Sequence, residues 1–541
     1  MQPERLPLSA GRFLPVLLAV LSGTLFLTRL SGTDLKEPNE PISAQAAREM
    51  IQRGDWIVPT VNGEPYPDKP PLLFWSIGLA SLPGGDVSET TARLPSALAA
   101  LALVLAVYYF SRRTLGEWGA FFAAATLAVS NLFVEQARYV QHDMLLCLGV
   151  TVSTLALFRL KDGDAPRGVW LALAAAALAL GILDKGPVAL ALPALVLCVE
   201  GALERSLFRR MGTLVFAGLL GMLPPVFYYV LLARRSGWDL VQTFLFRHNM
   251  ERFASGFDHA QPWWYFLAHF PVDLLPATLL LPAAIALRSD DPVRRRFHRR
   301  CWIGILVPLV FFSLSASKRP VYLLPALPYV ALLAGSVMEA LLRGESSKRV
   351  ARWASFGEAA AVAALLIGGL AAPFLALRRA PGLVPQAWML ALLAVAGALA
   401  GAALLLQRNV PRAHGALLTS LALIWLICIL WVFPAGNAIN SPRAFSEEIV
   451  RSVPPSAPLK TYGLYRFRSG YIFYAHRPMP RLADLPALLD YLRREERVFC
   501  VLPQEDFESL GGSLAGLSHV LARGHAGRRE EVLISNRPTP R

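Results

Sequence analysis

The amino-acid sequence predicts an α-helical protein that crosses a membrane about 13 times and ends in a small α/β domain outside the cytoplasm. Two observations predict this fold class. The 541 residues are 55% hydrophobic and only 17% charged, which is far more apolar than a soluble protein of this length requires. Apolar runs of spanning length also recur along most of the chain. Buried core helices of a soluble protein would need a polar exterior that this sequence lacks.

The predicted spans are the apolar runs that are long enough to cross a bilayer. They lie at about 13–31, 92–110, 119–135, 143–160, 168–183, 187–203, 212–232, 264–287, 301–316, 321–342, 356–377, 385–406 and 416–433. The first run follows Arg5 and Arg12, as a signal peptide would, but no small-residue cleavage site comes after it. We therefore interpret it as a retained first helix.

The basic residues predict the orientation of the spans. With a cytoplasmic N-terminus, the densest clusters of Lys and Arg all fall in cytoplasmic segments, as membrane proteins prefer. These clusters are Arg112 and Arg113; Arg159, Lys161 and Arg167; Arg205, Arg209 and Arg210; Arg294, Arg295, Arg296, Arg299 and Arg300; and Lys348, Arg349 and Arg352. An odd number of spans then places the first long loop and the C-terminal region outside. The net charge of +15 fits these loops and the anionic membrane lipids beside them, so nucleic acid is not needed as a partner.

The first outer loop, at about 32–90, has three predicted parts. ISAQAAREMIQRG has helical spacing and ends at Gly54, and NGEPYPDKPP is rich in turn residues. PLLFWSIGLASL is apolar but too short to span comfortably, so we expect it to lie along the membrane interface. The carboxylates and the lysine that this loop brings to the lipid boundary are Glu37, Glu40, Asp68 and Lys69.

The remaining chain divides into a membrane domain at 1–435 and a polar domain at 436–541. In the polar domain, LKTYG, RVFCVLP and EEVLISN have the composition of strands, and LADLPALLDYLRREER has the spacing of an amphipathic helix. This pattern predicts a small α/β domain. We interpret it as a stability or assembly module without catalytic residues.

Polar clusters stand at the outer ends of several predicted spans, where ionisable residues are costly and indicate function. They comprise Arg138, His142 and Asp143 in ARYVQHDMLL; Asp184 and Lys185 in LDKGPVAL; Arg247, His248, Glu251 and Arg252 in FRHNMERF; and Lys318, Arg319 and Tyr322 in SASKRPVYLLPALPY. All face the same side as the first loop. Cations there suit a phosphate, and carboxylates suit a general base or a divalent cation. A phosphorylated lipid that carries a sugar would meet both requirements.

Each polar residue also has a simpler interpretation. Asp184 and Lys185 could cap their helices and pair with each other within the turn. His248 and His259 could be ordinary interfacial histidines, and the prolines of PDKPP could only shape the turn.

The stretch EPNEPISAQAAREMIQRGDWIVPTVNGEPYPDKPPLLFW closely resembles the first outer loop of the bacterial dolichyl-phosphate-mannose-protein mannosyltransferase-like membrane glycosyltransferases, and most of all that of the lipid A aminoarabinose transferases. ARYVQHDMLL, LDKGPVALALP and SKRPVYLLPALPY resemble three further signatures of that family, in the same order. The resemblance covers about 12–340. It implies a GT-C fold and an inverting transfer of a sugar, an aminoarabinose-like pentose or a hexose, from a polyprenyl phosphate to lipid A or another lipopolysaccharide acceptor. The reaction would take place on the periplasmic face of the bacterial inner membrane.

The resemblance also implies roles for single residues. Lys69 would hold the donor phosphate, with Arg252 and Tyr322 as further phosphate contacts. Asp143 would be an acidic residue of the active site. Asp68 would be a ligand of a divalent cation, and either His248 or His259 would complete that metal site; the sequence leaves open which.

One position departs from the family pattern. Relatives carry Asp-Glu at the start of the loop helix, with the Asp regarded as catalytic, whereas this chain has Asn39 and Glu40. An Asn side chain cannot accept a proton as a base. Either Glu40 or Glu37 takes over the role, or Asn39 orients an acceptor that is already anionic, such as a lipid A phosphate, or the enzyme is weakened or altered. We expect retained activity with a contribution from Glu40.

Other functions stay open at this point. The acceptor could be a protein hydroxyl, as for protein O-mannosyltransferases, or another glycan. A lipid-linked sugar transporter or flippase would instead place ionisable residues near the bilayer midplane in broken helices. A structural protein without catalysis gains support only from Asn39.

Overall fold

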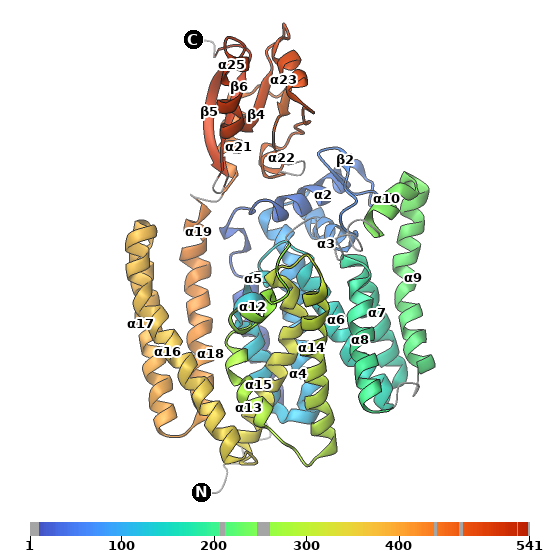
Figure 1. Ribbon diagram of the computed structural model, residues 1–541, viewed down its shortest axis with the longest axis vertical. Coiled ribbons are helices and arrows are strands. Elements are labelled where there is room, and N and C mark those ends of the chain that lie inside the picture. The colour runs from blue at the N-terminus through green and yellow to red at the C-terminus, as the bar shows by residue number, and fades with distance from the viewer. Residues whose placement is uncertain are drawn as a thin grey trace. The chain divides into compact units, whose positions relative to one another are not determined.

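The computed structural model describes residues 10–205, 211–245, 260–437, 441–464, 469–526 and 529–538, and it divides into two compact units (Figure 1). The first, here the helical unit, comprises Met1–Thr28, Pro67–Leu73 and Leu94–Val432. The second, here the mixed unit, comprises Arg29–Tyr66, Phe74–Arg93 and Phe433–Arg541. The domain boundary placed after residue 435 from the sequence stays a prediction.

The helical unit consists of helices and short helical turns. In chain order they are α1 (Ala10–Leu27), α4 (Glu89–Val129), α5 (Asn131–Ala137), α6 (Asp143–Asp162), α7 (Arg167–Lys185), α8 (Val188–Leu203), α9 (Met211–Ser236), α10 (Trp238–Gln242), α12 (Tyr265–Asp273), η4 (Ala277–Leu280), α13 (Leu281–Ala286), α14 (Pro292–Leu314), η5 (Pro320–Ala326), α15 (Leu327–Leu342), α16 (Lys348–Arg379), η6 (Pro381–Leu383), α17 (Val384–Leu406), α18 (Val410–Ile427) and η7 (Cys428–Val432).

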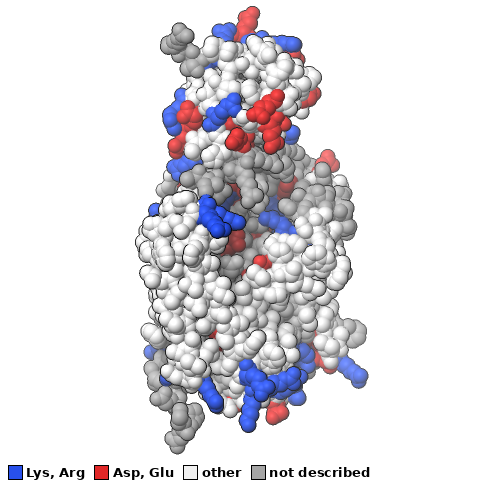
Figure 2. Space-filling model, turned by 60° about the vertical axis from the view of Figure 1, so that its left-hand side comes forward, with Lys and Arg blue, Asp and Glu red and all other residues white. Residues whose placement is uncertain are grey.

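The composition of these helices makes the chain a multi-pass membrane protein. Within the described residues, ten helices are long and apolar enough to cross a bilayer, or eleven if the bent pair Tyr265–Asp273 and Ala277–Ala286 counts as one span. Figure 2 shows a flank of the helical unit that is almost free of charged residues, with Lys and Arg gathered at its lower end. An uncharged band between polar ends is what a bilayer requires.

The predicted count of about 13 spans is not confirmed, and the difference arises at three places. The runs at 92–110 and 119–135 fall in α4, where two helices meet at a kink because Gly116 has a non-helical conformation with φ of 78°; together they count as one span. The run at 187–203 forms α8, whose 16 residues are short for a span. The run at 264–287 is bent by 96° between α12 and η4. Apolar composition predicted all of these segments, but it does not show how the backbone bends within them.

Burial separates the core helices from those that face lipid. The η5–α15 segment is 94% buried over its most apolar window, whereas the corresponding window of α16 is only 17% buried. Large apolar side chains of α16 such as Phe356 and Phe374 are about two-thirds exposed, at 65% and 67%. In water such a surface would be unfavourable, so these side chains are suited to contact lipid.

The loop part of the mixed unit begins with η1 (Leu30–Gly32) and the helix α2 (Asn39–Arg53). The helix predicted to stop at Gly54 is confirmed, because Gly54 takes the left-handed conformation with φ of 65° and donates its N–H to the carbonyl of Ile51. The short strands β1 (Thr60–Val61) and β2 (Glu64–Pro65) follow, and then α3 (Leu72–Ser81) and η2 (Leu82–Gly84). The short apolar segment predicted after PDKPP is therefore a helix of ten residues.

The C-terminal part of the mixed unit has a four-stranded sheet with the order β3-β4-β6-β5. Its elements are α19 (Phe433–Ala435), α21 (Arg443–Ser452), β3 (Leu459–Thr461), α22 (Gly470–Ala475), α23 (Leu485–Leu492), β4 (Phe499–Pro503), α24 (Gln504–Ser509), α25 (Gly511–Leu514), β5 (His519–Ala526) and β6 (Arg529–Ser535). β3 and β4 are parallel, and the other neighbours are antiparallel. The predicted α/β fold is confirmed, with β5 as a strand that the sequence analysis missed.

Candidate active site

The ends of three helical segments meet in the helical unit. Asp143 is the first residue of α6, Lys185 is the last residue of α7, and their side chains form an ion pair. The Lys185 ammonium also lies 5.1 Å from the ring centre of Tyr322 in η5. Three of the four polar clusters predicted to face one side are thus in contact, and the fourth, in FRHNMERF, lies outside the described residues. We call Asp143, Lys185 and Tyr322, with the nearby Arg319, the Asp143 cluster.

The local sequence explains why these side chains stand where they do. A carboxylate is favoured in the first turn of a helix and a cation in the last turn, because the helix ends carry opposite partial charges. Asp143 and Lys185 occupy those two positions. The chain leaves α7 at Gly186, whose N–H binds the carbonyl of Ile182. On η5, the Tyr322 ring also packs against Phe312, with 5.1 Å between ring centres. The ring is therefore fixed beside the ion pair.

The Asp143 cluster carries more positive than negative charge. Asp143 is 2% exposed, and both Lys185 and Arg319 act on it electrostatically. The side chain of Lys185 is 17% exposed, so its ammonium can be reached from outside. Two cations around one buried carboxylate leave a surplus that suits an anionic ligand such as a phosphate.

A second pair stands beside this cluster. The Nδ1 atom of His142 lies 3.0 Å from the Oδ1 atom of Asp184, and both side chains are buried. The alternative in which Asp184 and Lys185 pair with each other in the turn is therefore not what the structure shows. Each of them pairs with a residue at the start of α6 instead, and this joins α7 to α6.

Two cations of the predicted clusters have structural tasks. Arg138 donates to the carbonyls of Leu25, Phe26 and Thr28 at distances of 2.9, 3.2 and 2.8 Å, and so caps the C-terminal end of α1. Lys318 is buried and donates to the carbonyls of Ser315 and Gln261. Position in a polar cluster did not distinguish these residues from Lys185.

Asp68 and Lys69 lie in the turn before α3, in the part of the loop that belongs to the helical unit. Both are half-buried. Their roles at a donor phosphate and a cation stay predictions. Arg252, His248 and His259 lie outside the described residues. In the part of the chain that is described, no group of three or more His, Cys, Asp or Glu side chains is placed to hold a metal ion.

Glu40 and Asn39 begin α2 in the mixed unit. Glu40 is fully buried, and Arg93 donates two hydrogen bonds to its carboxylate: Nε to Oε1 at 2.8 Å and Nη2 to Oε2 at 2.7 Å. The Lys36 N–H also donates to Oε2, at 2.8 Å. A general base needs a lone pair directed at the acceptor, so this pairing counts against Glu40 as the base and gives it a structural task. Asn39 is half-buried at the start of the helix.

The sequence analysis missed the two arginines that hold α2 within the mixed unit. Arg93 also donates to the carbonyls of Leu30, Thr33 and Asp34. Arg48 is 3% exposed and binds Asp86 with two hydrogen bonds. Arg48 also donates to the carbonyl of Phe473 at 2.6 Å. For Arg93, its position at the start of the apolar run in TTARLPSALAAL was the available signal, whereas SAQAAREM gave no comparable signal for Arg48.

Residues 68–229 match the family model described as dolichyl-phosphate-mannose-protein mannosyltransferase. The undecaprenyl phosphate-alpha-4-amino-4-deoxy-L-arabinose arabinosyl transferase 2 of Pseudomonas fluorescens is 34% identical over 333 residues. This alignment covers 60% of the chain and 56% of the relative, so the chain spans little more than half the length of that curated protein.

Solved structures agree along nearly the whole chain. The crystal structure of ArnT from Cupriavidus metallidurans bound to undecaprenyl phosphate superposes with a TM-score of 0.80 at 22% identity, covering 97% of this chain and 98% of ArnT. The oligosaccharyltransferase of Archaeoglobus fulgidus in the apo form gives a TM-score of 0.52 at 11% identity, over 94% of this chain and 70% of that one. The resemblance predicted from the sequence is confirmed: the chain is similar to the aminoarabinose transferases and has the membrane fold of ArnT.

Proposed function

We propose that this protein is an integral membrane glycosyltransferase that transfers a sugar from a polyprenyl-phosphate donor to lipid A. The names of the relatives support the donor, and aminoarabinose is the sugar of the named relatives. The observation that carries the proposal is the Asp143 cluster, because it gathers cations and a fixed carboxylate where the ends of α6 and α7 meet η5 in the helical unit.

The cluster fits the charge that develops during transfer. An acceptor oxygen attacks the anomeric carbon while the bond from that carbon to the polyprenyl phosphate oxygen breaks. The departing phosphate keeps the bonding electron pair and gains negative charge. Lys185 and Arg319 would stabilise that charge, and Asp143 would hold Lys185 in position. Lys69, Arg252 and Tyr322 are the further phosphate contacts that the resemblance implies.

The acceptor determines whether a base is needed. A phosphate of lipid A is already ionised at neutral pH, so its oxygen can attack without losing a proton. Glu40 is held by Arg93, and Asn39 cannot act as a base. This combination favours a phosphate acceptor over a hydroxyl acceptor. A divalent cation, if one takes part, would bind near Asp68.

The position of the cluster supports an extracytoplasmic reaction. α6 carries Asp143 at one end and Asp162 at the other, and its 20 residues extend over about 30 Å, the thickness of a bilayer core. The Asp162 end lies among Arg159, Arg296 and Arg300, which are basic residues expected in the cytoplasm. We therefore propose that the Asp143 end of α6 faces the periplasm, with the protein in the inner membrane of a bacterium. The distribution of basic residues along the sequence predicts the same side for the first loop and the C-terminal region.

The transporter alternative has one observation in its favour. Glu358 of α16 and His414 of α18 are buried within spans, with 2.7 Å between Oε1 and Nδ1. The other ring nitrogen of His414 lies 2.9 Å from the hydroxyl of Thr126 in α4. Both ring nitrogens are thus engaged, and the three side chains tie α4, α16 and α18 together. This is better explained as helix packing than as a transport site.

Mass spectrometry of lipid A and of undecaprenyl-phosphate sugars tests the proposal. The source bacterium is compared with a deletion strain and with the deletion strain complemented by Lys69→Ala or Lys348→Ala. Deletion should remove a pentose or hexose from lipid A and make the lipid-linked donor accumulate. Lys69→Ala should fail to restore the substituent, and Lys348→Ala, at the exposed start of α16, should restore it at equal amounts of protein.

Two other results would overturn parts of the proposal. Unchanged lipid A with a changed glycan or glycoprotein profile would move the acceptor and keep the enzyme class. No change in any lipid, glycan or glycoprotein would contradict transfer and favour the transporter.

A further inference from the structure

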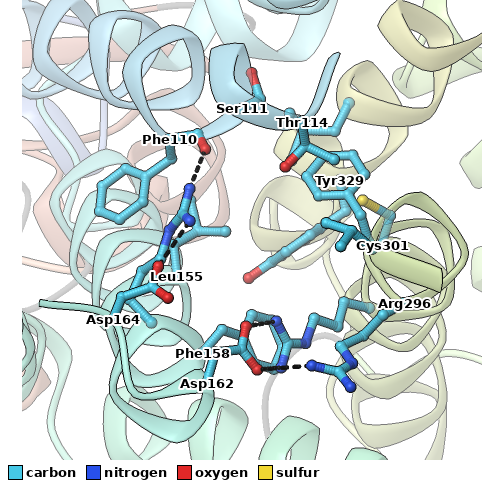
Figure 3. Close-up of a pocket in the computed structure, with 15 residues that line it drawn as sticks. Phe110, Ser111, Thr114, Leu155, Phe158, Asp162, Asp164, Arg296, Cys301 and Tyr329 are labelled. Carbon is cyan, nitrogen blue, oxygen red and sulfur yellow. Dashed lines mark hydrogen bonds and ion pairs between the residues drawn. The ribbon is translucent and has the colours of Figure 1, made fainter. Parts of the chain in front are cut away.

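A cavity of about 300 Å³ lies at the opposite end of α6 from the Asp143 cluster (Figure 3). Its walls come from α4, α6, α14 and α15, all within the helical unit. Because α6 links the two places over about 30 Å, this cavity opens at the other membrane face from the proposed site of transfer. It plays no part in the transfer reaction described above.

The mouth of the cavity is polar and carries a positive surplus. Arg159, Arg296 and Arg300 line it together with only two carboxylates, Asp162 and Asp164. Arg300 donates to both carboxylate oxygens of Asp162, from Nη1 to Oδ2 at 2.6 Å and from Nη2 to Oδ1 at 2.7 Å. Arg159 pairs with Asp164 at 2.9 Å. Arg296 pairs with Asp162 at 3.3 Å and with Glu204 at 3.2 Å, and Arg300 also pairs with Glu200 at 2.5 Å. Lys161 and Arg299 pair with the same two glutamates, so the connected network of five cations and four carboxylates keeps one positive charge. Arg296, whose side chain is 47% exposed, is the most accessible of the three arginines in the lining.

The interior of the cavity is mostly apolar, and the hydroxyl of Tyr329 is a buried polar group within it. Phe110, Phe158 and Leu155 line the wall. Tyr329 is 2% exposed, and its hydroxyl lies near that of Thr154, which donates to the carbonyl of Val150. Among the described residues, the Tyr329 hydroxyl makes no hydrogen bond of normal geometry. Figure 3 shows the Tyr329 side chain directed into the cavity. A buried hydroxyl without a partner is costly, so a ligand oxygen here would relieve that cost.

We propose that this cavity binds the phosphodiester headgroup of an anionic phospholipid from the cytoplasmic leaflet. A phosphodiester carries one negative charge, which matches the surplus at the mouth. Its oxygens can accept from Arg296 and from the Tyr329 hydroxyl, and the aromatic wall suits the glycerol backbone and the start of the acyl chains. Basic pockets between membrane helices at a cytoplasmic face are the type of site that recognises anionic headgroups.

Native mass spectrometry of the delipidated full-length protein tests this proposal. The protein in detergent is titrated with phosphatidylglycerol, phosphatidylcholine or glycerol phosphate. Phosphatidylglycerol should bind in preference to phosphatidylcholine. Arg296→Gln and Tyr329→Phe should each weaken that binding roughly tenfold, the effect of losing one hydrogen bond to a charged group. Arg295→Gln is the matched control: it removes the same charge from the neighbouring exposed residue, which does not line the cavity.

Each other outcome has a defined meaning. Equal binding of the two lipids, or an equal loss in Arg296→Gln and Arg295→Gln, would show charge attraction at the membrane surface and overturn the site. Binding of glycerol phosphate as tight as that of the lipid would replace the lipid by a soluble phosphate ester. The thermal midpoint of each variant without lipid separates lost binding from lost folding. None of these readouts depends on sugar transfer, so the site can fail while the proposed function stands, and the reverse also holds.

Discussion

Two buried ion pairs of this protein have the same chemistry and different surroundings. The pair of Arg93 and Glu40 is closed: its side chains are 2% and 0% exposed, and Arg93 donates to three carbonyls as well. The pair of Lys185 and Asp143 is partly open: Lys185 is 17% exposed and lies over the ring of Tyr322. An arginine whose donors are all used fixes a backbone, whereas a partly exposed ammonium can still bind a ligand.

The largest expected effect comes from breaking the closed pair. Arg93→Leu leaves Glu40 buried without its partner, so the free energy of unfolding should fall by about 3–5 kcal/mol. Thermal unfolding in detergent measures this loss. Arg493→Gln is the control, because Arg493 forms an exposed pair with Asp490 whose removal should cost about 0.5 kcal/mol or less. Arg93→Leu combined with Glu40→Leu should regain part of the loss, and a single variant as stable as the native chain would show that the pair has no structural role.

Breaking the open pair should separate folding from activity. Lys185→Met should lower sugar transfer by about 100-fold or more, because it removes a cation from the developing phosphate charge. It also leaves Asp143 buried without its closest partner and should lower the thermal midpoint. Adding Asp143→Asn should restore the midpoint but not the transfer. Recovery of transfer in the double variant would make the pair purely structural.

A smaller effect is expected at the ring beneath Lys185. Tyr322→Phe keeps the packing on Phe312 and the face toward Lys185 but removes the hydroxyl. If that hydroxyl contacts the donor phosphate, KM for the donor should rise about fivefold with kcat little changed, the equivalent of one hydrogen bond. Steady-state kinetics in detergent would measure this. Tyr109→Phe, at an exposed tyrosine of α4, is the control, and equal KM values in the two variants would show that Tyr322 does not contact the donor phosphate.

Sequence patterns predicted the parts of the fold that depend on local chemistry. Gly54 was recognised as a helix stop because it follows a helical pattern, and β4 was recognised from the run RVFCVLP. The strand β5, with the sequence HVLARGHA, was missed because its Gly and His residues interrupt the expected strand composition. It is held by pairing with β6, which only the folded chain shows.

For the candidate site as well, the sequence predicted some features and not others. The polar signatures around Asp143, Lys185 and Tyr322 were visible, since ionisable residues at helix ends stand out in an apolar chain. Their partners were not, because residues 42 positions apart in the sequence, such as Asp143 and Lys185, meet only when α6 packs on α7. The same limit applies to Glu40, which looked available as a base until Arg93 was seen to occupy its carboxylate.

The smallest effect is expected at Asn39, the neighbour of Glu40, where this chain departs from the family pattern. Asn39→Asp restores the family's carboxylate at the first residue of α2, beside Glu40, and a negative charge at a helix start is worth about 0.3–1 kcal/mol. With a phosphate acceptor, transfer should stay the same, because no proton has to be removed. With a hydroxyl acceptor, transfer should rise, because Asp can act as the base that Asn cannot. Transfer to lipid A and to a hydroxyl-bearing glycan, measured side by side, distinguishes the two cases, and Asn131→Asp at the exposed start of α5 controls for the added charge. A complete loss with both acceptors would mean that Asn39 binds the acceptor through its amide N–H groups, and the site would then have diverged from that of its relatives rather than lost one of its parts.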